Sequence, residues 1–225
     1  AIVLVKDGKT YKTIVVDINR DEKNGGVDVP ELVKDLVKKE GGKLSVFLNT
    51  HPHNDHLRDV VELSDAVDIQ EVWHSGHKPG KKHDDAYKNL KKVIKKVRKK
   101  HGASAETELK GSRSVKTLGD GKYYVLAPAE YVTDEIDDET AEQRSRRIHE
   151  QCAVLKFGHD DTWVMLTGDA ERDAWEKHIT EYHKKRLPSS VLGAAHHGSR
   201  TFFKYNKKDD AYMDALEEIA PKYII

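Results

Sequence analysis

A cluster of histidines and acids opens at position 51 and has the composition of a metal site. The segment His51-Pro52-His53-Asn54-Asp55-His56 follows an apolar stretch that ends at Leu48. Neutral imidazoles and carboxylates are the ligands that zinc and similar divalent metals prefer. A loop at a strand end can bring such side chains together, whereas side chains within a strand alternate between faces. The alternative is a chance grouping, because the chain has 13 histidines.

Two further apolar stretches end in residues that can bind a metal. Trp163 to Leu166 is followed by Thr167-Gly168-Asp169, and Val191 to Ala195 is followed by His196-His197-Gly198-Ser199. Taken alone, Asp169 could equally cap a helix that begins near Glu171. Several strands that all end in ligand-type residues favour one shared site at a sheet edge over unrelated features.

Strands and helices that would position these residues follow one another along the chain. Alternating and β-branched residues predict the strands, and apolar residues at helical spacing predict the helices. The predicted strands lie near 2–5, 11–18, 44–48, 69–73, 123–126, 152–157, 162–166 and 191–195, and the predicted helices span 30–40, 86–100, 171–185 and 209–219. Early strands come nearly in hairpin order and later strands alternate with helices, so we expect sheets inside and helices outside.

Length and composition predict one soluble domain over residues 1–225. Lys plus Arg and Asp plus Glu are both 39, so net charge offers no general argument for nucleic acid. No apolar run is long enough to span a membrane. The single cysteine, Cys152, excludes an intramolecular disulfide, favours a cytoplasmic location and is better explained by packing than by nucleophilic chemistry. Both ends of the chain fall within predicted strands, so we expect a domain trimmed at both ends.

Local positive charge is concentrated in the lysine-rich segment 78–100 and again after His197. The lysine-rich segment predicts either a solvated helix face or a cationic ridge that attracts phosphate-rich substrates. The basic residues of the second group are Arg200, Lys204, Lys207 and Lys208.

The three motifs together resemble the metallo-β-lactamase superfamily. The Thr-Gly-Asp and His-His-Gly-Ser pair most resembles the hydrolase domain of ComEC-type DNA-uptake proteins and their free-standing relatives. The resemblance runs through nearly the whole chain in order. It implies an α/β (α+β) fold, a four-layer αββα sandwich with the metal site at one edge of its two sheets.

The same resemblance implies a binuclear metal centre, with zinc as the first choice and manganese as the alternative. His51 and His53 would bind the first metal, and Asp55 and His56 the second. Asp169 would bridge the two metals, and Asp55 would help to orient a metal-bridging hydroxide.

Further positions take roles from the resemblance. His149 would be a ligand, although it could equally be a loop residue. His196 would be the last ligand and His197 would assist the leaving group, although the two could exchange roles. Asp17 would order the site by hydrogen bonds rather than by ligation. Substrate contacts are predicted for Ser199 and Arg200.

The predicted reaction is hydrolysis of a phosphodiester in nucleic acid or a nucleotide, by a metal-bridging hydroxide. One alternative is hydrolysis of a carboxylic ester, lactone, thioester or amide, and another is a non-catalytic metal-binding domain. Redox chemistry at a di-iron centre is disfavoured, because His53 occupies the place of the glutamate in the His-x-Glu-x-Asp motif of that branch. Fusion to, or association with, a larger protein stays open.

Overall fold

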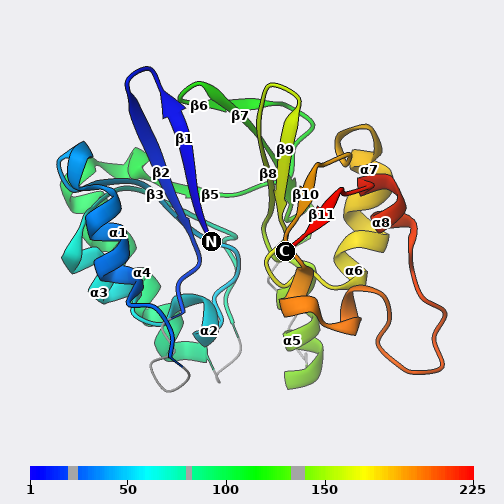
Figure 1. Cartoon of the computed structure of the whole chain (residues 1–225). Helices are drawn as coiled ribbons and strands as arrows, with labels where there is room; N and C mark the ends of the chain where they lie inside the picture. Colours follow the sequence, from blue (N-terminus) through cyan, green and yellow to red (C-terminus); the bar gives the residue numbers. More distant parts are fainter. Residues whose placement is uncertain (20–24, 80–82, 133–139) are drawn as a thin grey trace. The chain divides into compact units, whose positions relative to one another are not determined.

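The computed structural model of the chain describes residues 1–19, 25–79, 83–132 and 140–225. The chain divides into two compact units, residues 1–108 and 109–225, and each unit holds one sheet with its helices (Figure 1). The predicted mixed α/β class, with two sheets and accompanying helices, is therefore confirmed.

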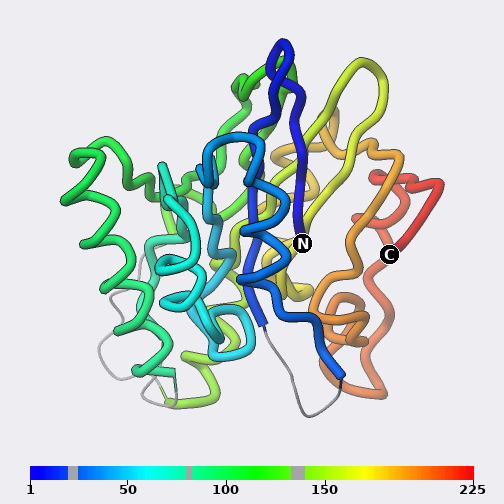
Figure 2. The backbone as a smooth tube through the Cα atoms, turned by 60° about the vertical axis from the view of Figure 1, so that its left-hand side comes forward, coloured from blue at the N-terminus to red at the C-terminus, as the bar shows by residue number. Residues whose placement is uncertain are grey.

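The first unit is built on a five-stranded sheet with the order β1-β2-β3-β4-β5. β1 is antiparallel to β2 and forms the hairpin at the blue end of the tube in Figure 2, whereas β2 to β5 run parallel. Because parallel strands point the same way, the residues that follow β2 and β3 leave the sheet at the same edge. The strands are β1 (Ile2–Asp7), β2 (Thr10–Val16), β3 (Lys43–Asn49), β4 (Asp68–His74) and β5 (Glu106–Glu108).

The helices of the first unit pack on this sheet through one apolar core. Leu90, Val93 and Val97 recur at helical spacing and are buried in the same cluster as Phe47 and Val72 of the sheet. The first unit's helices are α1 (Val29–Leu36), α2 (Asn54–Leu57), α3 (Val60–Ala66) and α4 (Asp84–His101), with 3-10 turns η2 (Lys38–Glu40) and η4 (Ala103–Ala105). The predicted helix 30–40 is α1 continued by η2, and it ends at the left-handed Gly41.

The second unit is built on a six-stranded sheet with the order β11-β10-β9-β8-β7-β6. β8 is antiparallel to β9, whereas β9, β10 and β11 run parallel. The carboxyl ends of β9 and β10 therefore share an edge with the amino end of β8. The strands are β6 (Lys116–Leu118), β7 (Gly121–Ala127), β8 (Val154–His159), β9 (Thr162–Leu166), β10 (Val191–Leu192) and β11 (Tyr223–Ile224).

Short helices surround a fully buried Trp175 in the second unit. Trp175 stacks edge-on against Phe202 at 5.4 Å between ring centres and lies in one apolar cluster with Met165, Ile179 and Leu192. The helical elements are α5 (Ala141–Glu150), α6 (Arg172–Ala174), the π-helical η5 (Trp175–Ile179), α7 (Thr180–His183), α8 (Asp214–Ile219), and 3-10 turns η6 (Lys184–Arg186), η7 (Ala195–Gly198) and η8 (Arg200–Phe202).

Several predicted elements differ from the observed ones. The predicted helix 171–185 is a succession of α, π and 3-10 turns, and the predicted helix 209–219 begins only at Asp214. The predicted strand 152–157 begins at Val154, and helix α5 was not predicted at all. Its amino-terminal signal is present, because Thr140 and Gln143 form a reciprocal capping box.

The lysine-rich segment 78–100 coincides largely with α4, and its residues 80–82 lie outside the described part of the chain. Several of its lysines form ion pairs with nearby acids, such as Lys96 with Asp65 and Lys100 with Asp68. In the described ranges, no helix is both long and apolar enough to cross a bilayer.

Candidate metal centre

The histidines that follow β3 lie together in the first unit. His51 is fully buried, and His53 and His56 are 7% and 5% exposed. The ring centre of His51 lies 4.5 Å from that of His53 and 4.1 Å from that of His56. The carboxylate of Asp55 is half exposed and lies 3.7 Å from His56 Nε2. The loop thus gathers the four predicted ligands of the first motif.

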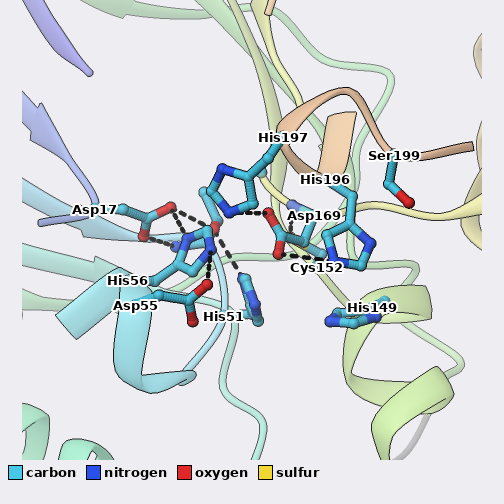
Figure 3. Close-up of polar contacts among 12 residues, drawn as sticks. Asp17, His51, Asp55, His56, His149, Cys152, Asp169, His196, His197 and Ser199 are labelled. Carbon is cyan, nitrogen blue, oxygen red and sulfur yellow. Dashed lines mark hydrogen bonds and ion pairs between the residues drawn. The ribbon is translucent and has the colours of Figure 1, made fainter. Parts of the chain in front are cut away.

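Asp17 follows β2 and accepts hydrogen bonds from three residues of this loop region. Its Oδ1 accepts from the backbone N–H of Thr50 at 2.8 Å and from Asn49 Nδ2 at 3.0 Å. Its Oδ2 accepts from the Thr50 hydroxyl at 2.6 Å. The same oxygen lies 2.8 Å from His56 Nδ1 (Figure 3). These contacts are of the kind that the resemblance implies for Asp17. The residue has a left-handed backbone with φ of 53°, which aspartate and asparagine tolerate better than most residues.

These hydrogen bonds determine which nitrogen of two histidines carries the proton. An ionised carboxylate only accepts, so His56 must donate from Nδ1. The Thr50 hydroxyl gives its one hydrogen to Asp17, and it therefore accepts from His51 Nδ1 at 3.2 Å. In both rings Nε2 is then the unprotonated nitrogen, which is the form that binds a metal.

In the second unit, Asp169 lies in a loop that hydrogen bonds hold in place. The Asp169 N–H donates to Cys152 Sγ at 3.2 Å, and the Thr167 hydroxyl donates to the Gly193 carbonyl at 2.8 Å. The N–H of His196 donates to the Gly168 carbonyl at 3.0 Å. The loops after β9 and β10 are thus joined to each other. Cys152 lies just before β8 and is fully buried, as its predicted packing role requires, and it also accepts the hydrogen bond from the Asp169 backbone.

His196 and His197 both direct Nε2 toward the carboxylate of Asp169. His196 Nε2 lies 3.6 Å from Oδ2, and His197 Nε2 lies 3.6 Å from Oδ1. Two zinc ligands at about 2.0–2.1 Å from the metal in tetrahedral geometry have donor atoms about 3.4 Å apart, so both pairs suit a shared ion. Both histidines have left-handed backbones, with φ of 47° and 53°, and such strain concentrates at functional sites.

His149 lies in the last turn of α5 rather than in a loop and is 8% exposed, and its role as a ligand stays a prediction. Its Nδ1 lies 3.2 Å from Oε1 of Glu171, and His196 Nδ1 lies 2.8 Å from the same oxygen. Burial would raise the pKa of Glu171, but hydrogen bonds from His149 and His196 outweigh it and lower the pKa to about 2. The three side chains form a group of ligand type within the second unit.

Two further residues near the predicted ligands were missed by sequence reasoning. Glu171 lies two residues after the strand-end Asp169, but a lone glutamate at the start of a helix gives no distinctive signal. His83 stacks on His53 at 4.0 Å between ring centres, and its Nδ1 accepts from the Asn54 N–H at 3.2 Å. His83 lies far from the first motif in the sequence, so no local pattern predicts this contact.

The two predicted substrate contacts lie just after His197, which is 63% exposed at its side chain. The Ser199 hydroxyl accepts from the Thr201 N–H and so caps the turn η8. Arg200 is exposed at the start of that turn. The structure gives Ser199 a local capping role, and the substrate contacts of both residues stay predictions.

The donor sets of the two units fit a divalent metal. Each offers imidazole nitrogens and a carboxylate, which is the set that zinc favours and that manganese also accepts. Several of these imidazoles are buried and have Nδ1 directed at an oxygen, as metal-binding histidines usually do.

No family model matches the chain, and no curated protein matches it with significance. A solved structure similar to it is CmlA, a diiron β-hydroxylase from Streptomyces venezuelae, at 12% identity and a TM-score of 0.52, covering 99% of this chain and 42% of CmlA. A mutant of CmlA gives 13% identity, a TM-score of 0.50, and coverage of 100% and 43%. BJP-1, a subclass B3 metallo-β-lactamase of Bradyrhizobium japonicum, gives 14% identity, a TM-score of 0.46, and coverage of 98% and 83%. This chain thus spans less than half the length of CmlA, and its likeness to CmlA is one of fold.

Proposed function

We propose that the protein is a metal-dependent hydrolase that cleaves phosphodiesters in nucleic acid or a nucleotide. The observation that carries the proposal is the state of the histidines: hydrogen bonds at Nδ1 leave Nε2 of His51 and His56 as the metal-binding nitrogen. Metal-binding histidines almost always donate their other ring N–H to an oxygen in this way. The Asp169 carboxylate between His196 and His197 adds a second group of the same chemical kind.

The choice of a phosphodiester is supported by the ComEC-type motifs and by local charge. Lys91, Lys95 and Lys99 are exposed at four-residue spacing along α4, so they lie on one side of the helix. Basic residues also follow the His196-His197 turn, in the segment 200–208. Such charges raise the local concentration of a polyanionic substrate and can contact its phosphates.

In the proposed reaction, His51, His53, Asp55 and His56 hold metal, as do His149, Asp169 and His196. Two bound divalent ions, zinc or manganese, would supply a water of lowered pKa and would stabilise charge on the phosphoryl oxygens.

The other side chains act on the substrate and on protons. Asp169 would hold and orient the attacking water through its carboxylate. His197 is mostly exposed, and it would deliver a proton to the leaving oxygen. Arg200 would contact a phosphate that is not cleaved.

Acyl hydrolysis is the rival reaction, because the same kind of metal centre also attacks carboxylic esters, lactones, thioesters and amides. The second alternative is not an enzyme but a domain that binds metal without catalysing a reaction. One experiment that compares a phosphodiester substrate with a lactone distinguishes both alternatives from phosphodiester cleavage.

The experiment measures hydrolysis of bis(p-nitrophenyl) phosphate by protein loaded separately with zinc and manganese, beside a simple lactone. Asp169→Ala tests the centre, and Asp160→Ala is the matched control, because Asp160 is an acid of the same unit with a side chain 88% exposed. The proposal expects metal-dependent diester cleavage that Asp160→Ala retains and Asp169→Ala loses. Cleavage of the lactone alone would establish the acyl reaction instead. Metal binding without turnover of either compound would contradict hydrolysis.

A further inference from the structure

One buried glutamate in the second unit contacts two of the predicted metal ligands. Oε1 of Glu171 lies 2.8 Å from His196 Nδ1 and 3.2 Å from His149 Nδ1. The ring centres of the two histidines are 4.6 Å apart, and the Glu171 side chain is 6% exposed. The hydroxyl of Thr201 also lies 3.1 Å from His196 Nδ1.

The distances identify Glu171 as a hydrogen-bond acceptor rather than as a third ligand. Two donor atoms bound to one tetrahedral zinc lie about 3.4 Å apart, whereas a charge-assisted N–H···O bond is about 2.7–2.9 Å long. The separation of 2.8 Å between Glu171 Oε1 and His196 Nδ1 matches the hydrogen bond. A carboxylate lone pair facing an unprotonated nitrogen at that distance would be repulsive, so Nδ1 of His196 carries the proton.

For His149 the argument is the repulsion between lone pairs rather than the distance, because its Nδ1 lies 3.2 Å from Oε1. An ionised carboxylate oxygen can accept two hydrogen bonds at once, but it cannot donate one. His149 and His196 both approach Oε1 through Nδ1, so both rings adopt the Nδ1–H form and both keep Nε2 unprotonated.

The backbone around this trio is held independently of the side chains. Glu171 caps the start of α6, and its carbonyl accepts from the N–H groups of Ala174 and of the fully buried Trp175. On the other side, His196 is anchored by its N–H to the Gly168 carbonyl. Glu171 and His196 therefore both lie on backbone that is itself hydrogen-bonded.

We infer that Glu171 is a positioning residue that holds His149 and His196 together in the Nδ1–H form, so that both present Nε2 to a divalent metal. The inference rests on the proposed metal centre for its purpose, but the contacts that it assigns join only side chains of this chain. Because one carboxylate contacts both rings, the loss of Glu171 should affect His149 and His196 together.

The first test is nitrogen NMR of the imidazole groups in metal-free wild-type protein at a pH where the histidines are neutral. The inference expects the Nδ1–H form for both His149 and His196. A dominant Nε2–H form in either ring would overturn it, and this measurement needs no variant that might fold poorly.

The second test is Glu171→Leu, which removes the one oxygen that both rings contact. Without this acceptor the Nδ1–H form loses its carboxylate partner in both rings, so the Nε2–H form should become populated. Competition with a chromogenic chelator should then show zinc affinity about 10- to 100-fold weaker than that of the wild type, the usual effect of losing a partner behind a metal ligand.

The matched control is Asp68→Leu in the first unit. Asp68 Oδ1 lies 2.9 Å from His101 Nε2, so the control removes another carboxylate from a histidine, at the opposite end of β4 from the strand ends that carry the predicted ligands. Its zinc affinity should equal that of the wild type. Wild-type affinity in Glu171→Leu, with both rings still Nδ1–H, would overturn the inference. A wild-type protein with the expected proton positions but no zinc binding would refute the proposed function and leave the assignment of the Glu171 hydrogen bonds standing.

Discussion

Replacing Asp17 with Asn tests whether one carboxylate organises the first ligand cluster. Asparagine has the same shape, and it tolerates the left-handed φ of 53° at this position. The substitution therefore removes charge and acceptor capacity without adding backbone strain. The amide oxygen can keep the contacts with the Thr50 N–H and with Asn49, which both go to Oδ1.

The contacts of Oδ2 cannot be kept, because the amide nitrogen takes the place of this oxygen and donates a hydrogen bond where the carboxylate accepted one. His56 must turn its unprotonated nitrogen toward the amide, and it then carries its proton on Nε2. The Thr50 hydroxyl must also accept, so its hydrogen turns to His51 Nδ1 and drives that ring to the same form. Both rings would thereby lose the nitrogen that binds metal.

The size of the effect follows from these bonds. Hydrogen bonds to a charged group contribute about 1.5–3 kcal/mol each and neutral ones about 1 kcal/mol. Because most contacts persist in neutral form, we expect the unfolding free energy of the metal-free protein to fall by about 2 kcal/mol. The loss of two competent ligands should weaken zinc binding by at least about 10- to 100-fold.

The assay combines urea denaturation of chelator-treated protein with zinc competition. Asp160→Asn is the control, because Asp160 also has a left-handed backbone, with φ of 50°, but an exposed side chain. The control should match the wild type in both measurements. An Asp17→Asn protein with unfolding free energy within about 0.5 kcal/mol of the wild type, and with equal zinc affinity, would refute the role of Asp17.

Other perturbations test other parts of the structure. Asp169→Asn should lose at least one equivalent of bound metal and most turnover, and metal analysis with full occupancy would remove Asp169 from the centre. Reversing the charge of Lys91, Lys95 and Lys99 should raise the KM for an oligonucleotide at low salt and leave the KM for bis(p-nitrophenyl) phosphate unchanged, whereas equal KM values for the oligonucleotide would leave these lysines as a solvated helix face. A hydrogen bond from a neighbouring histidine lowers the pKa of Glu150 from its usual 4.5, so Glu150 stabilises the fold above that pH and loses this contribution as the pH falls. The stability difference between wild type and Glu150→Gln, measured by urea denaturation, should therefore be about 1–2 kcal/mol at pH 7 and should shrink below pH 4.5, and a difference that is independent of pH would contradict it.

The sequence predicted the site best where ligands follow regular strands. Apolar runs ending at Leu48, Leu166 and Ala195 are recognisable, and we expected the polar residues after them to emerge at a sheet edge, although the observed strand β10 already ends at Leu192. The role of Asp17, in contrast, was predicted from the resemblance and not from a strand end. The mixed α/β class followed from the same alternation of strands and helices.

Features that depend on tertiary contacts were beyond such reasoning. Helix α5 has a mean composition too polar for apolar periodicity to reveal it, and only its capping box marks its start. The stretch after Glu171 carries a helical pattern, but burial of Trp175 accompanies a π-helical turn instead of a regular helix. Glu171 contacts His149, which lies 22 positions before it, and His196, which lies 25 positions after it. No local sequence pattern predicts contacts over such separations.

A common principle emerges from the two units. In the first, Asp17 orients His56 directly and His51 through the Thr50 hydroxyl. In the second, Glu171 contacts Nδ1 of both His149 and His196. Each unit thus contains an acceptor that is not itself a predicted ligand, and each acceptor sets the proton positions of two predicted ligands.

The number of metal ions bound per chain tests the central claim most directly. Protein stripped with a chelator would be reloaded with zinc or manganese, dialysed, and analysed by mass spectrometry of the metal. We predict two ions per chain, and a loss of both zinc binding and diesterase activity when the chelator returns. A protein that retains no metal after reloading, yet keeps its fold, would contradict the account.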